Sequence, residues 1–143
     1  MLKRIFCIVL FIFFTFGVSL NASAADRWQW IKWNDNVDVF VDVQTIEYDY
    51  GFTFSDNTPP AVGATAWSKF VYFNENKVGL RQDYYSFKNN TVTLLSTIIY
   101  VNNEVYYSKT YEQYEREKRP IPPGTFAEAI KEFLISRQWN VKI

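Results

Sequence analysis

The sequence predicts an α+β fold, with an antiparallel meander sheet of five to six strands packed against one C-terminal helix. The first observation is that apolar residues between residues 28 and 109 recur at the period of a strand, in runs separated by Asn-rich turns. The second is that residues 121–134 place their apolar side chains at the period of an α-helix. A chain of 143 residues is short enough for a single domain, which we expect to span residues 25–143.

Residues 1–24 have the pattern of a signal peptide. A basic pair precedes an apolar run at residues 5–18, and the small residues Ala22 and Ala24 follow it. This order predicts cleavage after Ala24, with Ala25 nearly as suitable, and export to the periplasm, the cell surface or the medium. The alternative is a permanent N-terminal anchor, but the run is short for a membrane span. We therefore expect no membrane span after cleavage.

The composition after cleavage narrows the classes of partner and chemistry. Loss of Lys3 and Arg4 takes the 15 basic residues to 13 against 15 acidic ones, a net charge of about −2. A chain without a basic excess is not expected to bind nucleic acid. The only cysteine, Cys7, leaves with the signal peptide, and the sequence has no histidine. We predict no disulfide, no cofactor and no metal site.

Aromatic and β-branched residues mark the first two predicted strands. Trp28, Trp30 and Trp33 open the mature domain, and we interpret them as hydrophobic core. The alternative is a stacking platform for a sugar or a peptide. Residues 37–43 carry a valine at every second position, which is typical of a strand with one buried face. The aspartates between these valines do not have the spacing of an EF-hand calcium loop.

Four further runs predict the rest of the meander. They span residues 66–74, 78–87, 91–101 and 104–109. The run at 91–101 is the most apolar, so we expect it to be central. Asn102 and Asn103 predict a tight hairpin turn, because asparagine tolerates positive φ. The charged residues 111–119 are interpreted as a solvated linker or sheet edge, with a ligand-binding strip as the alternative.

An irregular stretch at residues 47–63 carries the predicted partner-binding residues. It is long for a loop in a compact domain, so it is either functional or continues a strand in its first half. Its aromatic side chains offer apolar area, and tyrosine adds a polar tip, which suits an exposed contact surface. The predicted partner-binding residues are Tyr48, Tyr50, Phe52 and Phe54.

The stretch at residues 121–134 contains the predicted helix, and Pro122 and Pro123 end the chain that precedes it. Its apolar stripe consists of Phe126, Ala129, Ile130, Phe133 and Leu134. Thr125 and Glu128 have the spacing of a capping box at its start. Burial of the four large side chains would contribute about 6–12 kcal/mol before opposing terms, so we expect the helix to be essential to the fold.

The sequence contains no recognisable catalytic apparatus. It lacks a nucleophile–base pair, a histidine and a Gly-rich phosphate loop. A small hydrolase using two carboxylates is the remote alternative, because a glycosidase needs only such a pair. The available aspartates are Asp42, Asp49, Asp56 and Asp83. We predict that the protein is not an enzyme.

A series of landmarks in the mature chain resembles a known family. In chain order they are Trp30-Ile31, Phe40-Val41-Asp42 with Thr45-Ile46, Trp67-x-Lys69, Leu94-Leu95-Ser96, Tyr106-Tyr107-Ser108 and Ile121-Pro122-Pro123-Gly124-Thr125. Their order and spacing, from Trp28 to about Leu134, resemble the surface-adhesin protein E-like family of small exported bacterial domains. The resemblance implies an antiparallel sheet packed on a C-terminal helix, and it allows a homodimer.

The chain departs from this family at a cysteine pair. Many relatives join the strand before the apolar one to the C-terminal helix by a disulfide. The corresponding positions lie near Phe87 and near Phe133 or Leu134. We expect apolar contact between Phe87 and the helix to replace much of the lost bridge.

Together these observations predict an exported cell-envelope or surface module for binding or adhesion. The family's namesake is a surface adhesin that binds host extracellular proteins, so the expected partner is an extracellular or envelope protein. The alternative is a structural or stress-related envelope protein that acts as a homodimer.

Overall fold

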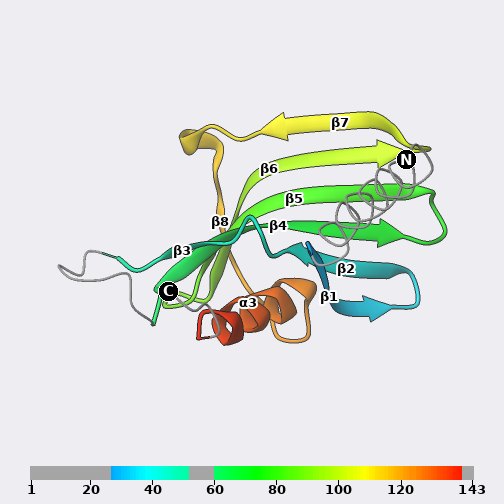
Figure 1. Cartoon of the computed structure of the whole chain (residues 1–143). Coiled ribbons are helices and arrows are strands. Elements are labelled where there is room, and N and C mark those ends of the chain that lie inside the picture. The colour runs from blue at the N-terminus through cyan, green and yellow to red at the C-terminus, as the bar shows by residue number, and fades with distance from the viewer. Residues whose placement is uncertain (1–26, 52–59, 140–143) are drawn as a thin grey trace, which may run out of the picture.

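An eight-stranded antiparallel sheet and one C-terminal helix make up the described chain, which confirms the α+β class (Figure 1). The computed structural model describes residues 27–51 and 60–139, so the predicted signal peptide lies outside the described residues. The strands are β1 (Trp28–Asn34), β2 (Val37–Asp42), β3 (Glu47–Asp49), β4 (Gly63–Tyr72), β5 (Lys77–Ser86), β6 (Thr91–Val101), β7 (Glu104–Thr110) and β8 (Lys118–Pro120). A 3-10 helix, η1 (Gln113–Glu115), precedes β8, and the α-helix is α3 (Phe126–Arg137).

The longer strands follow the order β1-β2-β4-β5-β6-β7, as a meander requires. β3 pairs with β4, and β8 pairs with β6. The prediction of five to six strands is therefore wrong, because these two strands of 3 residues each were missed. Three residues are too few for alternation to be recognised. β3 does lie in the first half of the stretch at 47–63, where a strand continuation was one alternative.

Asparagine residues close three of the hairpins. Asn76, Asn90, Asn102 and Asn103 have φ values of 46°, 53°, 51° and 66°. Asparagine enters this left-handed region more readily than most residues, since its short polar side chain can bond locally. The tight turn predicted at Asn102 and Asn103 is confirmed.

Helix α3 begins at the predicted cap. Thr125 is its N-cap residue, and the Thr125 hydroxyl accepts a hydrogen bond from the Glu128 backbone N–H at 3.3 Å. The Glu128 carboxylate accepts from the backbone N–H of Gly124 at 2.6 Å, one residue before the expected partner. The helix continues to Arg137, past the predicted end at Leu134.

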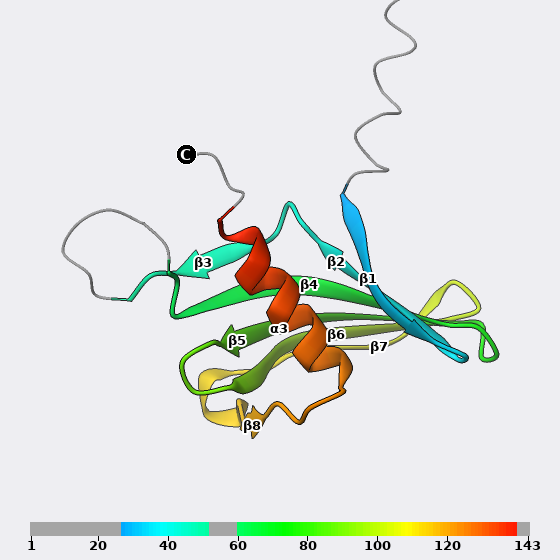
Figure 2. The ribbon, with the colours of Figure 1, turned by 90° about the horizontal axis from the view of Figure 1, so that it is seen from below.

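The core lies between α3 and one face of the sheet (Figure 2). Ile130 and Leu134 are 1% and 0% exposed, and they belong to one cluster with buried residues of β2, β4 and β5. Phe87 and Phe133 are only partly buried, and both pack against this cluster. Within the apolar stripe of the helix, Ile130 and Leu134 are therefore the most deeply buried side chains.

The strand register assigns side chains to two faces of the sheet, because directly opposed residues point to the same side. One row across five strands consists of Val39, Phe70, Gly79, Ile99 and Tyr107. Val39 and Phe70 belong to the core under α3, so we call this side the helix face. A neighbouring row on the other side, the open face, consists of Trp30, Phe40, Lys69, Leu80 and Ile98.

Candidate functional site

β7 and β8 share one edge of β6, and the chain between them leaves the sheet. β7 pairs with residues 96–101 of β6, whereas β8 pairs with residues 91–93. Leu94 and Leu95 lie between these paired stretches, and the Leu95 carbonyl accepts from the Tyr111 backbone N–H at 2.8 Å. The excursion from Tyr111 to Glu117, which includes η1, supplies one wall of a cavity.

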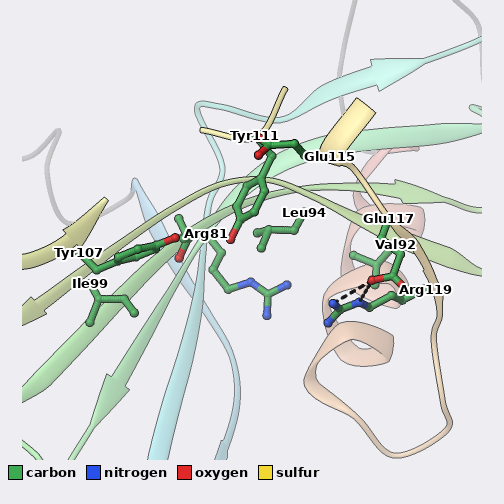
Figure 3. A pocket seen from close by; sticks show the side chains of 10 residues that line it. Arg81, Val92, Leu94, Ile99, Tyr107, Tyr111, Glu115, Glu117 and Arg119 are labelled. Carbon is green, nitrogen blue, oxygen red and sulfur yellow. Dashed lines mark hydrogen bonds and ion pairs between the residues drawn. The ribbon is translucent and has the colours of Figure 1, made fainter. Parts of the chain in front are cut away.

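This cavity has a volume of about 380 Å³ and is shown in Figure 3. Sites for small molecules typically have volumes of roughly 300–1,000 Å³. β6 supplies the apolar part of the lining, which consists of Val92, Leu94 and Ile99. The aromatic and charged part consists of Arg81, Tyr107, Tyr111, Glu115, Glu117 and Arg119. We call it the Arg81 cavity.

An ion pair holds Arg81 in place. Arg81 Nη2 donates to Asp83 Oδ1 at 2.8 Å, and the side chains of Arg81 and Asp83 are 42% and 1% exposed. The guanidinium carries five N–H donors in a planar fork, so the bond to Asp83 leaves other donors for the cavity. Figure 3 shows Arg81 in the middle of the lining. Burial alone would lower the pKa of Arg81, but the charge and hydrogen bond of Asp83 outweigh burial and raise it. Burial raises the pKa of Asp83, and the Arg81 charge only partly opposes this.

Two tyrosines form an aromatic wall. Tyr107 lies on the helix face of β7 and remains 41% exposed, and Tyr111 follows directly after that strand. The Lys109 ammonium lies 4.8 Å from the centroid of the Tyr111 ring, within the range of a cation–π contact. Burial and the neighbouring Tyr107 hydroxyl raise the pKa of Tyr111. The Tyr111 phenol therefore stays neutral over the physiological range. A tyrosine hydroxyl can donate as well as accept a hydrogen bond.

Two ion pairs lie along the excursion around the cavity. Lys109 Nζ lies 2.9 Å from Glu115 Oε1, and Arg119 Nη2 lies 3.0 Å from Glu117 Oε2. The other oxygen of Glu115 accepts from the Glu112 backbone N–H at 3.1 Å, which closes the turn of η1. The hydrogen bond from Lys109 is the largest cause of the lowered pKa of Glu115. Each charged residue of the lining thus has a partner of opposite sign.

Arg81 also borders a second cavity on the helix face, with a volume of about 280 Å³. This second cavity lies at the start of α3 and is lined in part by Phe126, Ile130 and Phe70. The guanidinium carbon of Arg81 lies 5.8 Å from the Phe70 ring centroid, and Phe70 packs edge-on against Phe126 at 6.2 Å. Arg81 is therefore a shared wall of two cavities along one face of the sheet.

Tyr48 and Tyr50, two of the predicted partner-binding residues, are not part of the lining of this cavity. Tyr48 packs against the core, and its hydroxyl donates to the Leu134 carbonyl at 2.9 Å. Burial raises the pKa of Tyr48 to about 12. Tyr50 is half-buried, with its ring centroid 6.2 Å from that of Tyr48. Phe52 and Phe54 lie outside the described residues. Tyr48 thus supports the helix, and partner binding by this stretch stays a prediction.

The tryptophans near the start of the domain belong to β1, which is an edge strand of the sheet. Trp30 is 46% exposed on the open face, so the interpretation of this residue as core is wrong. Its indole N–H donates to Asp38 Oδ1 at 3.1 Å. The Lys69 ammonium lies 4.9 Å from the Trp28 ring centroid and 4.7 Å from that of Phe40. Trp28 and Trp30 are therefore held by cation–π and hydrogen-bonding contacts without deep burial.

The aspartates considered for a hydrolase are engaged in structural contacts. Asp42 is 1% exposed and accepts from Arg27 Nε at 2.7 Å. Asp49 accepts from the Tyr84 hydroxyl at 2.9 Å. Asp83 is bound to Arg81 as described above, and Asp56 lies outside the described residues. The described aspartates do not form a pair that faces the Arg81 cavity.

No family model matches the chain, and neither a curated protein nor a solved structure matches it. Within residues 27–51 and 60–139, no cluster of three or more His, Cys, Asp or Glu could hold a metal ion. In the same residues, no helix is long and apolar enough to cross a membrane.

Sequence reasoning found only part of the Arg81 cavity. Four lining residues lie in the stretch 111–119, for which a ligand-binding strip was the alternative interpretation: Tyr111, Glu115, Glu117 and Arg119. Leu94 and Tyr107 were recognised as parts of strands and as landmarks of the family resemblance, and Arg81 was not selected. One usable signal is the period-two series Tyr107, Lys109 and Tyr111, which puts aromatic and charged side chains on one face of a strand. A strand whose face mixes these residue types is not suited to a sealed core.

Proposed function

We propose that this chain is an exported cell-envelope or surface module of the adhesion type, which acts by binding a partner and not by catalysis. The observation that carries the proposal is the Arg81 cavity. It combines an apolar floor, an aromatic wall and an anchored guanidinium, which is the composition expected of a binding site. The resemblance to the surface-adhesin protein E-like family supports the same class of function, with an extracellular or envelope protein as the expected partner.

Binding is favoured over catalysis by the way the charged groups are used. Glu115 and Glu117, the two carboxylates of the lining, are each held by a cation, at 2.9 Å and 3.0 Å. Hydrogen bonding and a nearby positive charge lower the pKa of Glu115, whereas a general acid needs a raised one. These carboxylates are therefore suited to recognition.

Export is supported by the N-terminal pattern of charge, apolar run and small residues. Expression of the full chain in a bacterial host, followed by fractionation and N-terminal sequencing, tests it. We expect the protein in the envelope or medium, with a sequence starting at Ala25. Retention of Met1 in the cytoplasmic fraction would count against export.

The binding proposal is tested with Tyr107→Ala combined with Tyr111→Ala. We expect this double variant to fold like the wild type and to lose the envelope component that the wild-type domain captures from cell-envelope fractions. Tyr106→Ala is the matched control, because Tyr106 is the preceding residue of β7, is 78% exposed and is not part of the lining. Equal capture by the double variant and the wild type would contradict the assignment of the cavity as the site.

A homodimeric envelope protein is the second candidate, and the open face of the sheet favours it. Its row of Trp30, Phe40, Leu80 and Ile98 is rich in large apolar side chains, and α3 packs on the opposite face. Large exposed apolar areas often mark protein interfaces. Sedimentation of the mature domain over a concentration series tests this candidate. A monomer at high micromolar concentration would argue strongly against it.

A further inference from the structure

We propose that the Arg81 cavity, together with the second cavity that shares Arg81, binds a neutral oligosaccharide. This inference rests on the proposed binding function, and it assigns a saccharide to the cavity in place of the protein partner that the family resemblance implies. It follows from the charge balance of the site, its hydrogen-bonding groups, its apolar surfaces and the arrangement of the two cavities.

The charge balance disfavours an ionic ligand. Arg81 is neutralised by Asp83, Glu115 by Lys109 and Glu117 by Arg119. The site therefore has no net charge to offer an anion or a cation. A charged ligand would have to compete with an existing partner or be partly desolvated without compensation, which is costly. A neutral ligand meets neither obstacle.

The site also presents hydrogen-bonding groups of both kinds. Arg81 presents donors, Glu115 and Glu117 present acceptors, and the hydroxyls of Tyr107 and Tyr111 can do both. A sugar hydroxyl donates one hydrogen bond and accepts others, so it can bridge a donor and an acceptor of the same ion pair. A purely apolar ligand would bury these polar groups without partners, at a cost in free energy.

The apolar surfaces complement the other side of a sugar ring. A pyranose has a face of C–H groups, and the flat rings of Tyr107 and Tyr111 offer an apolar surface of matching shape. Leu94 and Ile99 extend this surface along β6. The site thus offers polar and apolar groups side by side, as a sugar does.

The arrangement of the cavities favours a chain of sugars over a single one. The Arg81 cavity and the second cavity have volumes of about 380 Å³ and 280 Å³ and lie on one face of the sheet. Because Arg81 is a wall of both, its guanidinium can contact consecutive residues of one ligand. An oligosaccharide running from β7 towards the start of α3 would occupy both.

An array of neutral and acidic glycans, probed with the mature domain, tests the inference. We expect binding to neutral oligosaccharides, with little dependence on salt because no net charge is involved. Backbone amide NMR shifts on titration with the best-bound neutral glycan should change at Arg81, Leu94 and Tyr111. Binding only to acidic glycans, or to none, would overturn the inference.

A series of variants separates sugar stacking from other contacts. Tyr107→Phe with Tyr111→Phe keeps the rings and should retain part of the affinity. Tyr107→Ala with Tyr111→Ala should weaken binding by about tenfold or more, the scale expected for two aromatic contacts. Tyr106→Ala should bind like the wild type. An alanine pair that binds the neutral glycan as tightly as the wild type, while folded, would place the sugar elsewhere and refute the assignment.

The outcomes distinguish this inference from the proposed function. If the array stays blank while the alanine pair loses a captured envelope protein, the cavity is a protein-binding site and the saccharide inference is wrong. If the alanine pair changes neither glycan binding nor capture, the proposed use of the cavity fails as well.

Discussion

The helix face of the sheet has two halves that belong to the same rows of side chains but have different uses. Under α3, Val39, Ala66 and Tyr85 are sealed from solvent. Further along the same face, Ile99 and Tyr107 stay partly exposed beside a cavity. The strand register thus determines which face of the sheet a side chain occupies. Whether that side chain is buried in the core or lines a cavity depends on whether α3 covers it.

The largest contrast should appear between a leucine of α3 that packs on this face and a leucine of the face itself. Leu134→Ala removes a fully buried side chain and should cost about 2–5 kcal/mol, the range for buried leucines. Leu94→Ala trims a cavity wall and should cost less than about 1 kcal/mol. Urea denaturation of both variants measures the difference. Equal losses would show that the two halves of the face are packed alike.

A smaller effect is expected at Asp83, which lies at the border between the two halves. Asp83→Asn leaves the half-buried Arg81 guanidinium without its carboxylate acceptor and should cost about 1–3 kcal/mol near neutral pH, although burial also disfavours the ionised form of Asp83 itself.

The pH dependence of this variant gives a second readout. Burial raises the pKa of Asp83 above its ordinary 3.8, so the folded state holds this proton more tightly than the unfolded chain does. The contribution of Asp83 to stability is therefore greatest below pH 3.8 and declines as the pH rises through its raised folded-state pKa. We therefore expect the difference in free energy of unfolding between the wild type and Asp83→Asn to fall as the pH rises through this pKa. A difference that rises over the same window would contradict the raised pKa.

Tyr48 should give a smaller effect on the covered half. Tyr48→Phe removes the hydrogen bond to the Leu134 carbonyl while keeping the ring, and should cost about 0.5–1.5 kcal/mol. In the wild type, the pKa raised to about 12 means that stability is lost as the pH rises from 10 towards 12, because the folded state resists deprotonation. The phenylalanine variant should lose less stability over this window. Phenolate absorbance and alkaline denaturation together measure both effects.

The smallest effect on stability is expected on the uncovered half. Tyr107→Ala should change the free energy of unfolding by no more than about 0.5 kcal/mol, as for most exposed positions. Tyr85→Ala, on the covered half, is the comparison and should cost about 3–5 kcal/mol, the range for large aromatic side chains. A large loss at Tyr107 would mean that the cavity wall is structural.

The parts of the fold that the sequence predicts are those with long, regular patterns. The alternating valines from residue 37 predict β2, and the cap at Thr125 predicts the start of α3. The charged stretch at 111–119 conceals β8, because its pairing with β6 depends on main-chain hydrogen bonds and not on apolar side chains. Short strands of this kind are determined by the neighbouring strand.

The candidate site could not be predicted because a shift in register determines its lining. The register between β5 and β6 shifts at Gln82 and Asp83, so that Leu94 stands opposite Asp83 and Thr97 opposite Arg81. Regular alternation along β6 would place Leu94 and Thr97 on different faces. The irregularity brings both to the helix face, and only the pairing of the two strands reveals it.

The position of α3 at the end of the described chain sets the order of events during synthesis. All eight strands leave the ribosome before the helix does, so Val39 and Tyr85 stay without their cover until residues 126–137 emerge. Neighbouring strands of the meander can pair early, since they are close in sequence. Completion of the core must wait for the last turns of α3. A nascent chain of this protein therefore lacks a complete core until α3 has emerged.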